Sequence, residues 1–285
     1  MGSQNGLMSA ASLYGLVLFS AIAHAAWNAL MKSADDRMLT MATLRFAGLV
    51  LGLSVLPFVD WPARQSLVWL ALTAAAQFVY YVLLVRAYGV GDMSVVYPLA
   101  RGLAPMLTTL VAAFAIGETL TASQVVAVGL ISLGIMVLSL GAGARWQAVR
   151  LAIATGAVVA TYSFFAGLGV RQAGAVLSFQ ACLEIVTGLG TVGYVAAVRF
   201  ADLATFARKH AAAGLLAGAL SVAGFLAYLI AARSLPLGPV VALRETSVIF
   251  GAMLGSLVLK EGFGLRRLAA ACLVAAGIGL VAMPR

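Results

Sequence analysis

The sequence predicts an all-α integral membrane protein, with ten transmembrane helices arranged as two inverted five-helix repeats around a central cavity. Three observations predict this architecture. Of the 285 residues, 63% are hydrophobic and only 9% are charged, whereas soluble globular domains carry about 25% charged residues. The chain divides into about ten apolar stretches, each close to the roughly 20 residues that a membrane helix needs. In addition, one unusual apolar segment that contains an arginine occurs twice.

The expected spans are apolar runs separated by clusters of Gly, Pro and charged residues. We place them at 11–31, 38–58, 65–87, 94–116, 120–140, 150–169, 173–198, 211–232, 239–259 and 264–283. The connections are short. Only the one that contains DLATFARKH, at 202–210, is long enough to hold a short surface helix.

The repeated segment runs over Tyr97–Glu118 in its first copy and Ala242–Glu261 in its second. In each copy an arginine, Arg101 or Arg244, stands 17 residues before the closing glutamate. A helix of that length spans about 25 Å. Each copy is therefore expected to place one arginine inside the membrane and one glutamate at its surface.

This duplication predicts two halves, residues 1–145 and residues 146–285, with five spans each. Because five is an odd number, the two copies must insert with opposite orientations. Inverted repeats of this kind place the substrate site at their interface, near the membrane midplane.

Arg101 and Arg244 are the first candidates for substrate binding, because a cation in hydrocarbon is costly unless it faces a cavity or a partner. The alternative is structural: Arg244 would pair with Glu245 or Glu184. The other candidates are polar and aromatic side chains expected at membrane depth: His24, Trp27, Asn28, Gln77, Tyr81, Tyr97, Tyr162 and Tyr228. The three in the first span share one helix face, and hydrogen bonding between helices is the alternative role for them.

Glu184 and Glu245 are the carboxylates expected at membrane depth, which makes them candidates for proton coupling. His24 is a third candidate, since an unperturbed histidine has a pKa of about 6.5. Arg45 is expected near the start of the second span, where Asp35 or Asp36 would neutralise it.

Several classes of function are not expected. The sequence contains no GxSxG, HExxH, CxxC or Walker loop, so neither an enzyme nor a metal or cofactor site is predicted. The net charge is +9, but the basic residues stand singly or in pairs at helix ends, which disfavours nucleic-acid binding. The expected partners are a small-molecule substrate and the lipid bilayer. The oligomeric state stays open, and a monomer is compatible with the sequence.

The chain resembles the drug/metabolite transporter superfamily, in its ten-helix EamA-type branch. The resemblance covers essentially the whole chain. It rests on the five-plus-five duplication, the GE and KE pairs at 117–118 and 260–261, the Gly-rich helices that follow them, and LRF at 44–46. One departure is His24, which stands where family members often have a tryptophan.

The resemblance implies a location in the bacterial inner membrane and a cavity lined by spans one, three, four, six, eight and nine. It also implies cytoplasmic termini, whereas the distribution of Lys and Arg places the termini outside. The expected function is a secondary transporter that exports amino acids or related small metabolites by alternating access. The first alternative is an exchanger of phosphorylated or phosphonate metabolites against phosphate, because two arginines suit a dianion. A structural or lipid-handling membrane protein is the alternative from another class.

Overall fold

The computed structural model describes residues 8–32, 36–90, 93–139, 145–259 and 264–283. These residues form α-helices and one short 3₁₀-helix, and no β-strand occurs among them. The elements are α1 (Ala10–Lys32), α2 (Arg37–Val55), η1 (Leu56–Phe58), α3 (Arg64–Val90), α4 (Met93–Ile116), α5 (Ala122–Val137), α6 (Trp146–Gln172), α7 (Val176–Ser234), α8 (Leu237–Glu245), α9 (Ser247–Leu259) and α10 (Leu265–Ala282).

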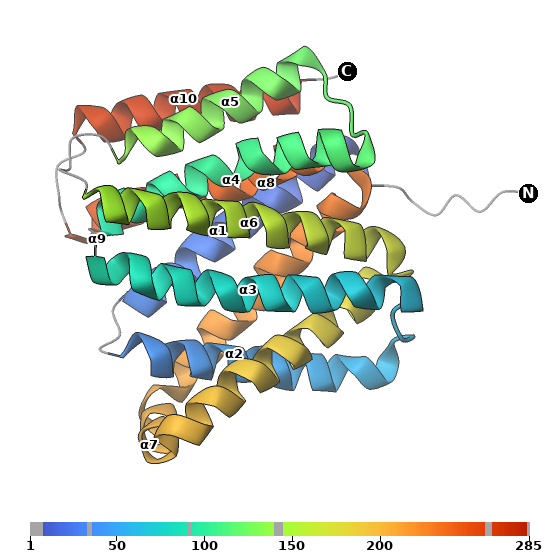
Figure 1. Cartoon of the computed structure of the whole chain (residues 1–285), viewed down its shortest axis with the longest axis vertical. Helices are drawn as coiled ribbons and strands as arrows, with labels where there is room; N and C mark the ends of the chain where they lie inside the picture. The colour runs from blue at the N-terminus through green and yellow to red at the C-terminus, as the bar shows by residue number, and fades with distance from the viewer. Residues whose placement is uncertain (1–7, 33–35, 91–92, 140–144, 260–263, 284–285) are drawn as a thin grey trace, which may run out of the picture.

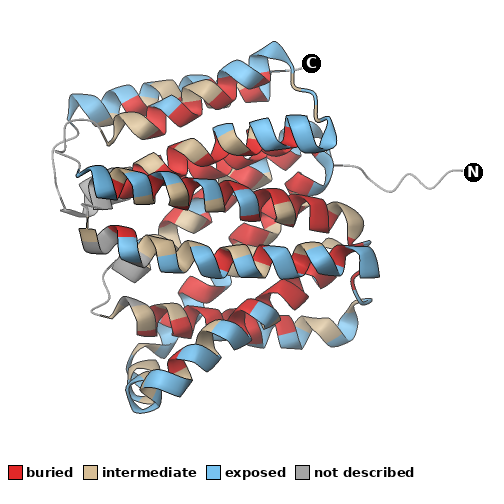
Figure 2. Cartoon of the chain, in the orientation of Figure 1, coloured by how far each residue is buried: buried red, intermediate tan, exposed pale blue. Residues whose placement is uncertain are grey.

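Seven of these helices are long and apolar enough to cross a membrane: α1, α2, α3, α4, α6, α7 and α10. The fifth expected span corresponds to α5, which is apolar but only 16 residues long. The ninth is divided between α8 and α9. The count of ten spans therefore stays a prediction, whereas the all-helical membrane architecture agrees with the sequence. Many large apolar side chains are exposed, as lipid contact requires, and Figure 2 shows exposed positions along the outer helices.

The longest helix, α7, contains two expected spans and the surface connection between them. A straight helix of its 59 residues would measure about 90 Å, three times the thickness of a bilayer core. Non-helical backbone angles at Arg199 and His210 divide it into three parts. Figure 1 shows α7 reaching the lower edge of the molecule and turning back there. The short surface helix predicted in DLATFARKH lies at this reversal.

The start of α2 is attached to this reversal by Asp36. Its carboxylate caps the helix by accepting from the amides of Met38 and Leu39 at 3.0 and 3.1 Å, and it pairs with Arg199 at 2.6 Å. Burial alone would raise the pKa of the Asp36 carboxyl, but the hydrogen bonds from Leu39 and Arg199 lower it below its ordinary value.

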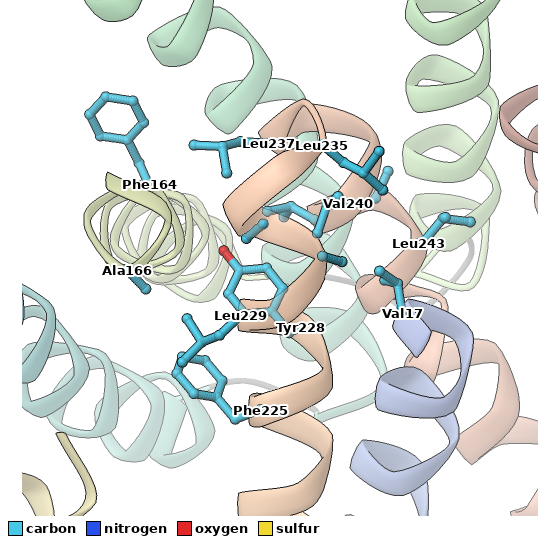
Figure 3. Close-up of a cluster of buried hydrophobic side chains, with 14 of the residues drawn as sticks. Val17, Phe164, Ala166, Phe225, Tyr228, Leu229, Leu235, Leu237, Val240 and Leu243 are labelled. Atoms are coloured by element: carbon cyan, nitrogen blue, oxygen red, sulfur yellow. The ribbon is translucent and has the colours of Figure 1, made fainter. Parts of the chain in front are cut away.

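Helices from the two halves of the chain pack against each other throughout the molecule. In Figure 1, α5 and α10 lie together at one edge, and α2 packs on α7 at the other. Between these edges α3 and α4 pack on α6, and α1 packs on α7 and α8. The main core lies where these helices meet, around Tyr228, Leu237 and Leu243, as Figure 3 shows. The halves are interleaved, so any relative motion between them must break contacts of this kind.

The contact between α5 and α10 is reciprocal. Gly134 of α5 lies against the carbonyl of Ala270, which a Cβ atom on the glycine would approach to 3.1 Å. In the same way, Gly277 of α10 lies against the carbonyl of Ala127, which a Cβ atom on the glycine would approach to 2.9 Å. Such an exchange of equivalent contacts is what a two-fold axis between two copies produces.

The residues that play equivalent parts in this contact are separated by the same number of positions in the sequence. Ala127 precedes Ala270, and Gly134 precedes Gly277, by 143 residues (270 − 127 and 277 − 134). The two repeated arginines are also 143 residues apart (244 − 101). This agreement supports the inverted repeat, which itself stays a prediction.

We expect Gly134→Ala and Gly277→Ala each to destabilise the protein by about 1–3 kcal/mol, because the added methyl group meets backbone that cannot rotate away. Thermal unfolding of the purified protein in detergent measures the effect. Gly129→Ala and Gly279→Ala on the same two helices are the matched controls, since no atom lies within 4 Å of the added Cβ at either position. Equal losses in all four variants would contradict this account of the packing.

Candidate functional site

A buried ion pair joins the two halves of the chain at the centre of the helix bundle. Arg101 of α4 and Glu245 of α8 approach to 2.7 Å between Nε and Oε2, and Arg101 NH1 donates to Oε1 at 3.2 Å. The two residues are 1% and 0% exposed. Both charges are therefore removed from water, and each depends on the other for compensation.

The backbone at Glu245 explains its position. Pro236 precedes α8 and Pro239 lies in its first turn, and the helix ends at Glu245. The next residue, Thr246, separates α8 from α9, and its hydroxyl donates to the carbonyl of Leu243 at 2.6 Å. Thr246 keeps right-handed helical backbone angles (φ −59°, ψ −14°) and its amide bonds to the Leu243 carbonyl, so the ninth span tightens by a short turn beside its charged pair.

The fourth span differs from the ninth, although both contain prolines. Pro98 and Pro105 both lie inside α4, which continues through them as one helix. Each proline lacks the amide hydrogen that would complete the helical ladder, but no second helix begins after either. The two spans therefore differ in their backbone, since the ninth tightens at Thr246 and the fourth continues as one helix.

His24 of α1 contacts the same cluster. Its Nε2 atom lies within hydrogen-bond distance of the Arg101 guanidinium. A guanidinium group can only donate, so Nε2 is the acceptor and carries no proton. The Trp27 ring packs edge-on against His24, with 4.9 Å between ring centroids. Asn28 instead donates to the His24 carbonyl at 2.8 Å, so its amide forms a bond within its own helix and not between helices.

Arg244, the second repeated arginine, has different surroundings. Its guanidinium carbon lies 5.0 Å from the centre of the Tyr228 ring and 5.1 Å from that of Phe225. Its NH1 is 3.8 Å from Glu245 Oε1, so the expected pairing with the neighbouring glutamate is a distant one. The expected alternative pairing with Glu184 is wrong, because Glu184 pairs with another arginine.

The aromatic residues that lie against the two arginines come from α4 and α7. Tyr97 of α4 lies beneath Arg101, with 5.4 Å from the guanidinium carbon to the ring centre. Tyr228 is fully buried, and its hydroxyl donates to the carbonyl of Ser163 in α6 at 2.8 Å. Figure 3 shows that hydroxyl directed at α6, away from the aliphatic residues of α8.

A second buried ion pair also joins the two halves. Arg45 of α2 lies 3.4 Å from Glu184 of α7 and donates a hydrogen bond to the hydroxyl of Tyr81. Gln180 donates to the other carboxylate oxygen of Glu184 at 2.7 Å. The missing side chain of Gly48 makes room for this carboxylate, since a Cβ there would lie 2.5 Å from Glu184 Oε2.

The prediction for Arg45 is therefore wrong. The residue is buried and paired across the halves, whereas it was expected near the membrane surface beside an aspartate. Asp36 is used instead by the helix cap and by Arg199, and Asp35 lies outside the described residues. The sequence contained one indication of this pairing. Gly48 follows Arg45 by three residues, which places both on one helix face and leaves room there for a side chain from another helix.

Tyrosine rings extend from the second ion pair toward the first. The ring of Tyr81 packs on that of Tyr80 at 5.2 Å, and Tyr80 packs on Tyr162 at 5.8 Å between centroids. Tyr162 is buried in one cluster with Tyr80 and with Ala104 of α4. Gln77 is buried on α3, but its carbonyl oxygen accepts no hydrogen bond from the described residues.

The predicted site residues thus fall into two groups with Tyr162 between them. The first contains His24, Trp27, Tyr97, Arg101, Tyr228, Arg244 and Glu245; the second contains Tyr81 and Glu184, with Arg45 added by the structure. In neither group, nor elsewhere in the described ranges, do three or more His, Cys, Asp or Glu side chains form a set that could hold a metal ion.

The glutamate of the GE pair has a structural role at one end of the bundle. Glu118 accepts from the guanidinium of Arg171 at 2.9 Å and from the amide of Leu237 at 2.7 Å. Arg171 also donates to the carbonyls of Ala232 and Leu235. Glu118 therefore fixes the start of α8 relative to α4 and α6. The corresponding Glu261 lies outside the described residues.

We expect Glu245→Gln, which keeps the shape of the side chain and removes its charge, to lower the free energy of unfolding by about 3–5 kcal/mol. Two buried guanidinium groups would be left without a carboxylate. Asp202→Asn is the control: it breaks the exposed pair with Arg199, which is worth about 1 kcal/mol or less. A Glu245→Gln protein as stable as the wild type in thermal unfolding would show that the carboxylate is not ionised.

Comparison with known proteins shows the fold and a family likeness over the first part of the chain. No curated protein matches the chain. A solved crystal structure of a protein with 16% sequence identity superposes with a TM-score of 0.72 over 95% of both chains, which shows a shared fold. Residues 11–140 match the EamA-like transporter family, whose members move small molecules across membranes. The chain is therefore a multi-pass membrane protein, and its residues 11–140 are similar to the EamA-like transporters of the drug/metabolite transporter superfamily.

Proposed function

We propose that the protein is a secondary transporter of the bacterial inner membrane that exports amino acids or related small metabolites by alternating access. The observation that carries this proposal is the Arg101–Glu245 pair, which is buried between the two halves beside the turn that joins α8 and α9. Alternating access requires two repeats to move against each other around a site at their interface. An ion pair in that position can exchange one of its partners for a charged substrate.

In this proposal a substrate carboxylate binds a guanidinium group, which can donate two parallel hydrogen bonds to it. The aromatic rings of Trp27, Tyr97 and Tyr228 accept varied substrate side chains, because aromatic surfaces contact apolar groups of many shapes. The remaining proposed lining residues are His24, Asn28, Gln77, Tyr81, Arg101, Tyr162 and Arg244. The central cavity would form as the halves separate around these side chains.

Exchange of a phosphorylated or phosphonate compound against phosphate is the second candidate. It is favoured by the two guanidinium groups that stand beside a single carboxylate, an arrangement that attracts anions. It ranks second because no lysine accompanies the arginines in either cluster of the described residues.

Among the proposed proton carriers, Glu184 is favoured. Its carboxylate lies 3.4 Å from Arg45, whereas that of Glu245 lies 2.7 Å from Arg101. Protonation of Glu184 therefore breaks a weaker ion pair than protonation of Glu245 would. His24 is the weakest of the three, because a proton on Nε2 would place an imidazolium against the Arg101 guanidinium.

Proteoliposomes test the proposed activity. We expect labelled amino acids to cross the membrane and to exchange with unlabelled substrate on the other side, whereas protein-free liposomes show neither process. Inorganic phosphate discriminates the two candidates, since it competes only in a phosphate exchanger. A protein that moves no labelled amino acid and no phosphate ester would favour the structural or lipid-handling role.

For coupling, we expect Glu184→Gln to abolish the acceleration of transport by an imposed pH gradient while exchange at equal pH continues. The amide cannot carry a proton, but it keeps the shape that Gly48 accommodates. Asp202→Asn is the control for loss of a negative charge and should respond to the gradient like the wild type. Acceleration that survives in Glu184→Gln would exclude this residue as the carrier.

A further inference from the structure

The charges buried in the central cluster do not balance. Arg101 and Arg244 contribute two positive charges and Glu245 one negative charge, which leaves +1 (2 − 1). His24 is neutral, because it accepts from Arg101. Tyr97 and Tyr228, the other titratable groups against the two guanidinium groups, are uncharged phenols. The second ion pair, Arg45 with Glu184, is neutral as a whole.

The uncompensated charge is located on Arg244. Glu245 lies 2.7 Å from Arg101 but 3.8 Å from Arg244. Arg244 is only 5% exposed, and its Nε and NH1 atoms donate no hydrogen bond to any described residue. The rings of Phe225 and Tyr228 attract the face of the guanidinium, but they cannot accept from the N–H groups at its edges.

The imbalance arises from a difference between the two copies of the repeated segment. Glu245 follows Arg244 in the second copy, whereas Gly102 follows Arg101 in the first. Gly102 packs against α5, where a Cβ would lie 2.9 Å from the carbonyl of Ser132. The first copy thus uses this position for helix packing, and one carboxylate serves two arginines.

An isolated charge is costly to bury, and a group of opposite charge removes that cost. We infer that Arg244 binds the oxyanion group of the substrate, a carboxylate or a phosphonate, and that the preferred substrate carries one net negative charge. Arg101 is then a positioning residue, which holds Glu245 away from Arg244. This inference rests on the proposed transport function and narrows its substrates from neutral zwitterions to organic anions.

Thermal unfolding of the purified protein in detergent tests this assignment with benzoate, phenylphosphonate, benzamide and benzylammonium as probes. A ligand that binds only the folded state raises the melting temperature. We expect a rise with benzoate or phenylphosphonate and none with the neutral or cationic probe. Whichever anion gives the larger rise identifies the oxyanion. A rise with benzamide equal to that with both anions, or no rise with either anion, would overturn the inference.

Variants separate Arg244 from general charge effects. Arg244→Gln should lose the response to the anions, and its melting temperature without probe should equal or exceed that of the wild type, because a surplus buried cation has been removed. Arg244→Lys keeps the charge but not the planar donors, so its apparent affinity should fall at least tenfold. Arg233→Gln, which removes an exposed arginine, should respond like the wild type. An anion response that persists in both Arg244 variants would contradict the assignment.

These experiments distinguish failure of the Arg244 assignment from failure of the proposed transport function. If proteoliposomes transport neutral amino acids and the anionic probes do not bind, the transporter stands and the role of Arg244 is wrong. If the anions bind through Arg244 and no substrate crosses the membrane, the binding site stands and the transport proposal is wrong.

Discussion

Charge buried in a low-dielectric interior constrains this protein more than any other feature. Each of the two ion pairs takes its arginine from the first half of the chain and its glutamate from the second. Removing either partner would leave the other without compensation in a place that water does not reach. The halves are therefore held together by these two ion pairs, by the apolar core around them, and by close glycine contacts such as those between α5 and α10.

Close packing and ion pairs respond differently to displacement. Close packing through glycine, as at Gly134 and Gly277, resists displacement because the backbones are already in contact. Ion pairs can instead change partners when a charged ligand arrives. Glu118 attaches the start of α8, and with it the ninth span, to α4 and α6.

Much of the fold follows from the sequence, because the need to satisfy backbone hydrogen bonds in lipid allows few solutions. Apolar runs gave the helix positions to within a few residues, and the polar connection at 202–210 correctly indicated a helical reversal within α7. The division of the ninth span at Thr246 was not predicted, since Pro236 and Pro239 lie at the start of that span and no proline stands beside Thr246. The site was predicted in part: Arg101, His24 and Glu245 do meet, but single-sequence patterns do not specify partners 77 and 144 residues apart. The error at Arg45 has the same origin, because local neighbours were assumed where a distant glutamate is the partner.

The most direct test of the central claim is a double-mutant cycle between Arg101 and Glu245. The unfolding free energies of the wild type, Arg101→Gln, Glu245→Gln and the double variant would be compared in detergent. A buried ion pair between the halves predicts a coupling energy on the order of 2–3 kcal/mol, with the double variant more stable than the sum of the single effects implies. Additive effects, with a coupling energy near zero, would show that the two charges do not depend on each other and would contradict the account.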